Sequence, residues 1–101
     1  MPAVGNERFR LTSSEFRVVI HREEPDELGL ELDQVTLYVD AVAEGLFQQW
    51  NERNKGRQVR PGDRIVEVNG IRGDVPAMLL ECELAARLDF VFQGAPGNRN
   101  R

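Results

Sequence analysis

The sequence predicts an α+β fold: a small, partly open antiparallel β-barrel of five or six strands capped by two helices. Several short segments alternate apolar and polar residues with the two-residue period of strands, and two others have apolar residues at helical spacing. Two dipeptides, Pro61-Gly62 and Asn69-Gly70, are strong turn signals. A length of 101 residues suits one domain with a single modest core.

The first half of the chain predicts three strands and a short helix. Residues 15–21 alternate strictly between apolar and polar side chains, and two shorter stretches repeat the pattern. Leu46, Phe47 and Trp50 follow at helical spacing, so the aromatic side of this helix is expected to pack on the sheet. The expected elements are strands at residues 15–21, 30–33 and 37–42 and a helix at residues 44–51.

The second half predicts two more strands and a longer helix. Pro61-Gly62 indicates a type II turn, because proline presets the first central residue and glycine accepts the positive φ of the second. Asn69-Gly70 is the preferred pair for a tight hairpin turn. Asp74 is expected to cap the second helix, with Pro76 in the first turn, where its missing N–H costs nothing. The expected elements are strand 64–68, a return through residues 71–72, helix 75–86 and strand 88–93.

The predicted domain covers residues 15–93. Residues 1–14 are polar and residues 94–101 combine Pro, Gly, Asn and Arg, so both ends are expected to be flexible. The composition of the C-terminal end also favours a monomeric module of a larger protein.

Composition argues against several classes of function. A net charge of −4 disfavours nucleic acids and anionic membrane surfaces, and no apolar run approaches the ~20 residues that cross a bilayer. Cys82, the one cysteine, excludes an intrachain disulfide and is compatible with a reducing compartment, which favours a cytoplasmic protein. With His21 as the one histidine, no catalytic site, metal site or cofactor is expected. A cluster of basic residues is interpreted as a solvated loop in preference to a phosphate patch: Arg53, Lys55, Arg57 and Arg60.

The stretch Leu28-Gly29-Leu30 is the first candidate for a functional site. A glycine between large apolar residues, after a turn at Pro25 and Asp26, can direct successive amides into one concavity that attracts an anion. A strand at residues 30–33 follows directly, so a C-terminal carboxylate could enter the concavity while its peptide pairs with the strand edge. The alternative is an ordinary turn before a strand, which these residues taken alone favour.

The order of these signals resembles that of PDZ domains. The run VRPGDRIVEVNG, residues 59–70, lies between a short helix and a longer one, as in that family. Leu28-Gly29-Leu30 is similar to the family's carboxylate-binding loop, usually written Gly-Leu-Gly-Phe, and the resemblance covers residues 15–93. Glu27 and Leu30 depart from the loop pattern. Glu27 adds a negative charge, and its backbone must not need the positive φ that a glycine permits.

The resemblance implies an intracellular interaction module, of the kind found in signalling scaffolds, that binds the free C-terminal tail of a partner protein by strand addition. The groove would lie between the second strand and the second helix, and a hydrophobic terminal residue is expected in the ligand. The implied residues are Leu28, Gly29, Leu30 and Arg22 around the carboxylate, and Glu31, Leu32, Asp33, Val75, Leu79 and Cys82 along the groove.

Two features of the implied groove would set its selectivity. Val75 takes the position that contacts the ligand residue two before the end, which implies a hydrophobic preference there. A groove face that starts at Asp74 would instead favour a hydrogen-bond donor such as Tyr. The loop before the second strand carries four carboxylates: Glu23, Glu24, Asp26 and Glu27. They either favour ligands with Lys or Arg upstream of the C-terminus or form a solvated acidic loop with no part in binding.

The alternative function is a PDZ-like domain that does not capture C-termini and acts in dimerisation or as a regulatory domain of a larger protein. Glu27 favours this alternative, and the retained Leu28-Gly29-Leu30 pattern opposes it. Catalysis is not expected, because Cys82 lies among the apolar positions of a helix, where buried and inert thiols are common.

Overall fold

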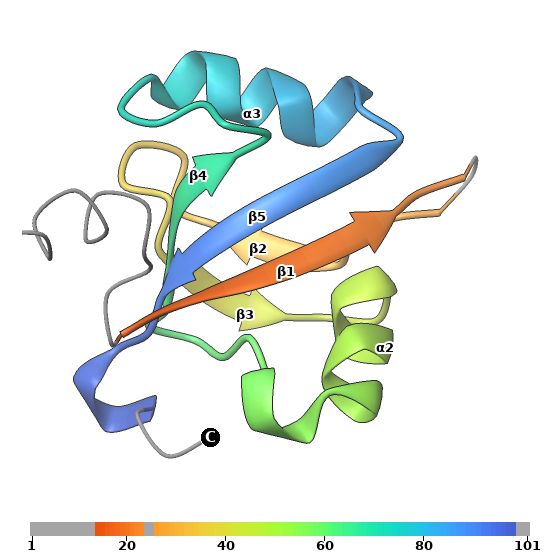
Figure 1. Cartoon of the computed structure of the whole chain (residues 1–101), viewed down its shortest axis with the longest axis vertical. Helices are drawn as coiled ribbons and strands as arrows, with labels where there is room; N and C mark the ends of the chain where they lie inside the picture. Colours follow the sequence, from red (N-terminus) through yellow and green to blue (C-terminus); the bar gives the residue numbers. More distant parts are fainter. Residues whose placement is uncertain (1–13, 24–25, 99–101) are drawn as a thin grey trace, which may run out of the picture.

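The computed structural model describes residues 14–23 and 26–98, and within them it confirms a small α+β domain of five strands in antiparallel sheets with two helices (Figure 1). The strands are β1 (Glu15–His21), β2 (Leu30–Leu32), β3 (Val39–Val42), β4 (Arg64–Val68) and β5 (Arg87–Gln93). The helices are α2 (Leu46–Arg53) and α3 (Val75–Leu84), with two short 3-10 turns, η1 (Lys55–Arg57) and η2 (Pro96–Asn98).

The strands form two sheets that meet at one corner. β5 lies between β1 and β4 in the larger sheet, and β2 pairs with β3 in the smaller one. The sheets are linked where β3 and β4 begin, because Tyr38 forms an isolated bridge with Arg64 and the Val39 amide donates to the Asp63 carbonyl at 2.7 Å. Among the described strands, β1 and β2 therefore each keep one edge without a partner strand.

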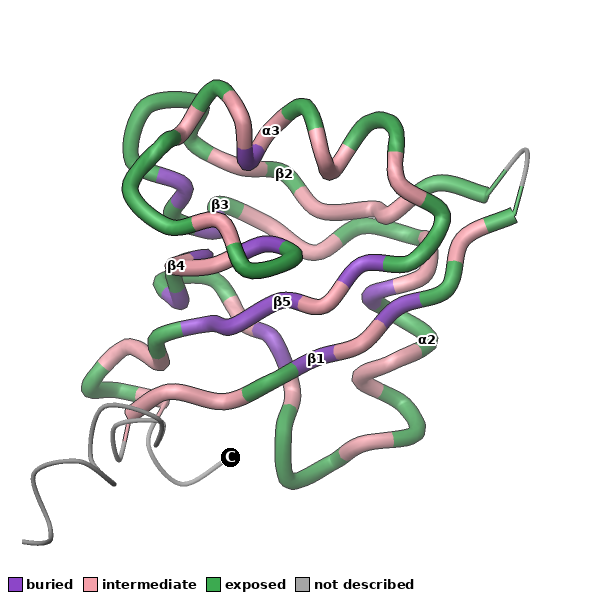
Figure 2. The backbone as a smooth tube through the Cα atoms, turned by 45° about the horizontal axis from the view of Figure 1, so that its top comes forward, coloured by how far each residue is buried: buried purple, intermediate pink, exposed green. Residues whose placement is uncertain are grey.

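The core lies between the sheets and α2. Phe47 of α2 is fully buried, and its ring centroid lies 5.2 Å from that of Phe90 and 5.7 Å from that of Phe92, both on β5. This packing is the one expected from the aromatic side of the first helix. Burial of each such side chain stabilises the fold by about 1.5–3 kcal/mol. Figure 2 shows β5 as the most continuously buried strand, as its central place in the sheet requires.

Both turn signals produce the expected turns. Gly62 has φ 94, and the Asp63 amide donates to the Arg60 carbonyl at 3.1 Å, which closes a type II turn. Asn69 and Gly70 have φ 49 and 82, as a type I′ turn requires. The chain returns from this turn through one isolated bridge, Val68–Ile71, so it forms no sixth strand within the described residues.

The connection between β2 and β3 differs from expectation. A strand was expected from residue 37, but Leu37 has φ 63 and lies in a turn whose amides are bound by the Asp33 carboxylate. Leu37 is nevertheless buried, with 2% of its surface exposed. Burial of this apolar side chain offsets a backbone conformation that L-residues rarely adopt. The alternation of apolar and polar residues predicts correctly that Leu37 is buried, but it carries no information about the backbone angles of this residue.

Helix boundaries shift by two residues. α2 begins at Leu46 and ends at Arg53 instead of covering 44–51, and α3 ends at Leu84 before residue 86. The Asp74 carboxylate accepts the Ala77 amide at 3.1 Å, which confirms the expected cap. None of the helices in the described ranges has the length and apolar character that crossing a membrane requires.

The described part of the C-terminal end is held against the domain. The sequence predicts a flexible tail at residues 94–101, but Ala95 and Asn98 are bound to the buried carboxylate of Asp63. This carboxylate accepts the Ala95 amide and the Asn98 side-chain amide, each at 2.9 Å. Residues 1–13 and 99–101, and with them most of the two expected tails, lie outside the described residues.

Candidate functional site

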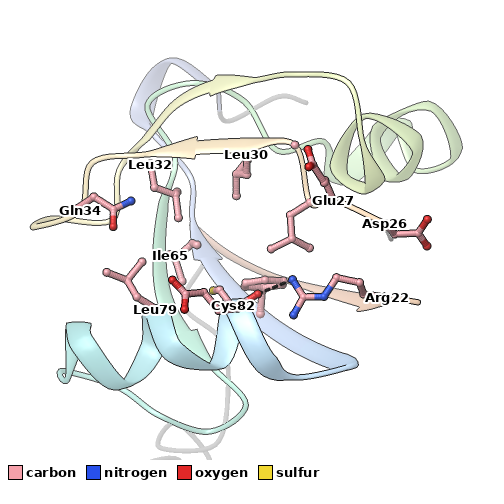
Figure 3. Close-up of a pocket in the computed structure, with 13 residues that line it drawn as sticks. Arg22, Asp26, Glu27, Leu30, Leu32, Gln34, Ile65, Leu79 and Cys82 are labelled. Atoms are coloured by element: carbon pink, nitrogen blue, oxygen red, sulfur yellow. Dashed lines mark hydrogen bonds between the residues drawn. The ribbon is translucent and has the colours of Figure 1, made fainter. Parts of the chain in front are cut away.

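A groove of about 340 Å³ lies between β2 and α3 (Figure 3). Leu30 and Leu32 of β2 point across it toward α3, which contributes Leu79 and Cys82 from the other side. Residues lining this β2–α3 groove are Arg22, Asp26, Glu27, Leu28, Gly29, Leu30, Leu32, Gln34, Ile65, Leu79, Cys82, Glu83 and Phe90. The groove therefore has apolar walls and charged residues near the loop end of β2.

The loop that precedes β2 presents amides on one side and carbonyls on the other. Three successive carbonyls accept hydrogen bonds from the region where α2 begins: that of Glu27 from the Leu46 amide at 3.0 Å, that of Leu28 from the Phe47 amide at 3.0 Å, and that of Gly29 from the Ala43 amide at 2.8 Å. In a planar trans peptide the N–H points opposite to the C=O. Each of these three carbonyls shares its peptide bond with the N–H of the following residue. The N–H groups of residues 28, 29 and 30 therefore face away from α2, on the side where the groove lies.

These three amides have no hydrogen-bond acceptor within the described residues. Buried or partly buried backbone donors are nearly always paired with protein, water or a ligand. Three donors that converge on one side of a loop form a concavity suited to an anion. The geometry thus provides an anion-binding arrangement at the loop end of the groove.

Gly29 is required by this arrangement. It has φ 70, and a Cβ added there would lie 2.6 Å from the Glu44 carbonyl oxygen. Gly45 makes the reciprocal contact, since its added Cβ would lie 2.8 Å from the Glu27 carbonyl oxygen. The two backbone segments consequently pack closer than side chains would allow. Glu27 itself is not among the residues with positive φ, so it occupies its position without backbone strain.

The edge of β2 that faces the groove is open. The bond from the Ala43 amide to the Gly29 carbonyl makes the next residue pair, Leu30 and Val42, a non-hydrogen-bonded pair of the antiparallel ladder. The N–H and C=O of Leu30 therefore point away from β3 and toward the groove. Since β2 pairs with β3 alone among the described strands, this edge can accept another strand.

Arg22 connects the end of β1 to the end of α3. Its amide donates to the Ala86 carbonyl at 2.7 Å, and its guanidinium donates to the carbonyls of Cys82 at 2.5 Å and Ala85 at 2.8 Å. The last carbonyls of a helix carry partial negative charge and are stabilised by a cation. Arg22 therefore fixes α3 relative to the loop and leaves a positive charge in the groove wall (Figure 3).

Carboxylates also line this groove. They belong to Asp26 and Glu27 of the loop before β2 and to Glu83 of α3, and all three residues are exposed. Two charges about 4 Å apart in water interact by roughly 1 kcal/mol, and salt weakens this further. Repulsion of this size would weaken the binding of an anion there, but it is smaller than the contribution of several amide donors. Glu24 and Pro25, which belong to the same acidic loop, lie outside the described residues.

Cys82 faces the groove as a neutral thiol. Burial raises its pKa to about 11. The thiolate is therefore rare at neutral pH, and the side chain behaves as a small apolar surface. Within the described residues, no three His, Cys, Asp or Glu side chains gather where they could hold a metal ion.

Seven of the residues expected from the sequence line the β2–α3 groove, and three do not. Glu31 is exposed and lies outside the groove lining. Asp33 binds the amides of Thr36 and Val35, each at 2.9 Å, and these bonds lower its pKa. Val75 instead lines a smaller cavity of about 110 Å³. The seven that the fold brings together are Arg22, Leu28, Gly29, Leu30, Leu32, Leu79 and Cys82.

Four further residues line the groove without having been expected from the sequence: Gln34, Ile65, Glu83 and Phe90. Ile65 and Phe90 are buried residues of β4 and β5, and their alternating positions signal a core without indicating that its surface opens into a groove. Gln34 belongs to a short connector with no pattern of its own. Glu83 lies four residues after Leu79 on α3, so helical spacing could have found it, but the i, i+4, i+7 pattern counted from Val75 ends at Cys82.

Comparison with protein-family models gives no match, and comparison with curated proteins gives none that is significant. The assignment of a function therefore depends on the geometry of the site.

Proposed function

We propose that this chain is a PDZ-like domain that binds the free C-terminal tail of partner proteins by adding the tail as a strand to β2. The observation that carries the proposal is the set of three amides, at residues 28–30, that face the groove without an acceptor beside an open strand edge. The partly open barrel of that family would consist of the two sheets, linked by the bridge between Tyr38 and Arg64.

In this proposal the ligand's terminal carboxylate replaces the missing acceptor. Each hydrogen bond from an amide to a charged group contributes about 1.5–3 kcal/mol, and the Arg22 guanidinium adds a favourable charge nearby. The peptide backbone then pairs with the N–H and C=O of Leu30, which is independent of the ligand's sequence.

Apolar side chains determine the last residue of the ligand. Leu28 and Leu30 from the loop and strand line the apolar space next to the amides, and Leu79 of α3 lies opposite Leu32 further along the groove (Figure 3). Burial of a Val- or Leu-sized side chain there stabilises the complex by about 1.5–3 kcal/mol. The expected ligands end in Val, Leu, Ile or Phe. Because Val75 lies outside the groove, Leu79 is the first α3 side chain that reaches the upstream part of the ligand, and it favours an apolar residue there.

Titration of the protein with fluorescent peptides that end in a free apolar residue tests the proposal. Leu30→Glu places a carboxylate in the groove wall and is expected to abolish binding. Arg53→Ala, on α2 outside the groove, is the matched control and is expected to leave binding unchanged. Equal binding by the wild type and by Leu30→Glu would refute the placement of the peptide.

The acidic residues at the loop end favour a second candidate, a PDZ-like domain that acts in dimerisation or as a regulatory domain without capturing C-termini. Three carboxylates, those of Asp26, Glu27 and Glu83, line the groove against the one guanidinium of Arg22. Under this candidate, peptides with a free and an amidated C-terminus would bind equally or not at all.

A further inference from the structure

A second strand edge is open on β1, on the side of this strand away from β5. Hydrogen bonds at both ends of the β1–β5 ladder, from the Gly94 amide to the Ser14 carbonyl at 2.6 Å and from the Arg22 amide to the Ala86 carbonyl at 2.7 Å, fix which residues face β5. The register between them is unbroken. Because the ladder alternates, even-numbered residues bond to β5, and Val19 points its N–H and C=O to the opposite edge.

His21 is in the same position as Val19, two residues further along the strand. No acceptor or donor for the outward backbone groups of these two residues exists within the described part of the chain. An edge of this kind is a template for another strand unless the protein covers it.

A groove of about 350 Å³ accompanies this edge, between β1 and α2. Figure 1 shows α2 beside the end of β1, and contacts between the two elements confirm that they are neighbours. Val19 of β1 and Leu46 and Trp50 of α2 supply its apolar wall. This β1–α2 groove shares none of its lining residues with the β2–α3 groove.

The charge of the β1–α2 groove is opposite to that of the first groove. Arg53 and His21 are its ionisable lining residues, and no carboxylate lines it. The Trp50 indole N–H donates to the Arg57 carbonyl at 2.9 Å, which holds η1, with the cations of Lys55 and Arg57, against the same end of α2. In a chain with a net charge of −4, this basic end is a local exception. It complements an acidic ligand.

We propose that the β1–α2 groove is a second docking site, which binds an extended acidic segment of a partner protein as a strand on β1. The open edge supplies backbone pairing, the wall around Trp50 accepts alternate apolar side chains, and the cations at the end of α2 attract Asp or Glu side chains. This assigns a role to three cations that the C-terminal peptide groove leaves unused: Arg53, Lys55 and Arg57.

Trp50 reports on this site directly, because it is the single tryptophan of the chain. The probe is a short peptide of alternating Val and Glu, blocked by acetylation and amidation so that it cannot place a free carboxylate in the β2–α3 groove. The matched probe has Lys in place of Glu. The Glu peptide is expected to shift Trp50 fluorescence with saturation, and the Lys peptide is not.

Three variants separate the contributions. Val19→Pro removes an outward N–H that β5 does not use, so it is expected to abolish binding while the fold is retained. Arg53→Gln is expected to weaken binding about threefold, and Arg60→Gln, whose guanidinium bonds to the Gln58 side chain at 2.9 Å, to leave it unchanged. Leu79→Lys, which blocks the first groove, should bind the Glu peptide normally. Binding of the Glu peptide at the β1–α2 groove is thus tested separately from the C-terminal peptide proposal, and either one can fail without the other.

Several results would overturn the second site. They are the absence of a saturable change with the Glu peptide up to about 1 mM, equal binding of the Lys peptide, or normal binding by Val19→Pro. Self-association of the wild type that Val19→Pro removes would overturn the choice of an outside partner and assign the edge to a second copy of the chain. If Val19→Pro fails to fold, the comparison of Arg53→Gln with Arg60→Gln still tests the site, and equal binding of the Glu peptide by these two variants would overturn it.

Discussion

Replacement of Gly29 by alanine is expected to destabilise the protein by about 2–5 kcal/mol, as two costs add. A residue with a Cβ at φ 70 costs about 1–2 kcal/mol. The added Cβ would also lie 2.6 Å from the Glu44 carbonyl oxygen and 2.9 Å from that of Ala43. Both are backbone atoms, so the loop or the start of α2 has to move, which costs about 1–3 kcal/mol more.

Gly73→Ala is the matched control for the backbone angle. Gly73 has φ 75, close to that of Gly29, but a Cβ there would meet nothing within 4 Å. Its expected destabilisation is about 1 kcal/mol, because only the conformational cost applies. Urea unfolding of the two variants measures the difference as a change in midpoint at constant m-value.

The same pair of variants tests the site. The shift that relieves the Cβ clash at Gly29 moves the amides of residues 28–30 out of alignment, so binding of a C-terminal peptide should fall in Gly29→Ala and persist in Gly73→Ala. Measurement is made at a temperature where both variants are folded. Equal destabilisation of the two variants, or full binding by Gly29→Ala, would refute the close packing of the loop.

Two further predictions concern buried groups. Alkylation of Cys82 at neutral pH should be about 100-fold slower in the folded protein than in the urea-unfolded chain. Burial raises the pKa of the thiol from 9.0 to about 11, so the folded protein contains less of the reactive thiolate. Comparable alkylation rates would contradict this prediction. Asp63→Ala should lower the melting temperature by about 10–20 °C, since it leaves the Arg60 and Ala95 amides without acceptors. The exposed Asp40→Ala is its control, and an equal shift in both would contradict a role for the carboxylate.

Local chemistry was sufficient to predict the parts of the fold that turns delimit. β4 begins and ends where expected, because Pro61-Gly62 and Asn69-Gly70 each have one favoured turn geometry and bracket it. The burial and backbone conformation of Leu37 do not follow from local chemistry in this way. Its burial depends on the position of the hairpin against the core, and neither the pattern nor its propensity contains that information.

The sequence predicts the residues that the loop and β2 contribute to the groove better than the residues that α3 contributes. Leu28, Gly29 and Leu30 follow from a glycine at a strand entrance. α3 has apolar residues on every side, so its sequence does not show which face turns to β2. Helical spacing placed Val75 with Leu79, whereas tertiary packing directs Val75 into another cavity.

The C-terminal segment illustrates the same point for a polar residue. In the sequence, Asp63 is only the residue after a Pro-Gly turn. In the structure it is fully buried and holds residues 95 and 98 through its carboxylate. The binding of a distant segment by one carboxylate leaves no periodic signal, so the composition of the segment predicts a flexible tail.

Calorimetric titration with two peptides that differ in the terminal group alone, a free carboxylate and an amide, tests the central claim most directly. Loss of one charge-assisted interaction of about 1.5–3 kcal/mol predicts that the amide binds tenfold to about a hundredfold more weakly. Equal affinities would contradict the claim that the amides of residues 28–30 receive a carboxylate.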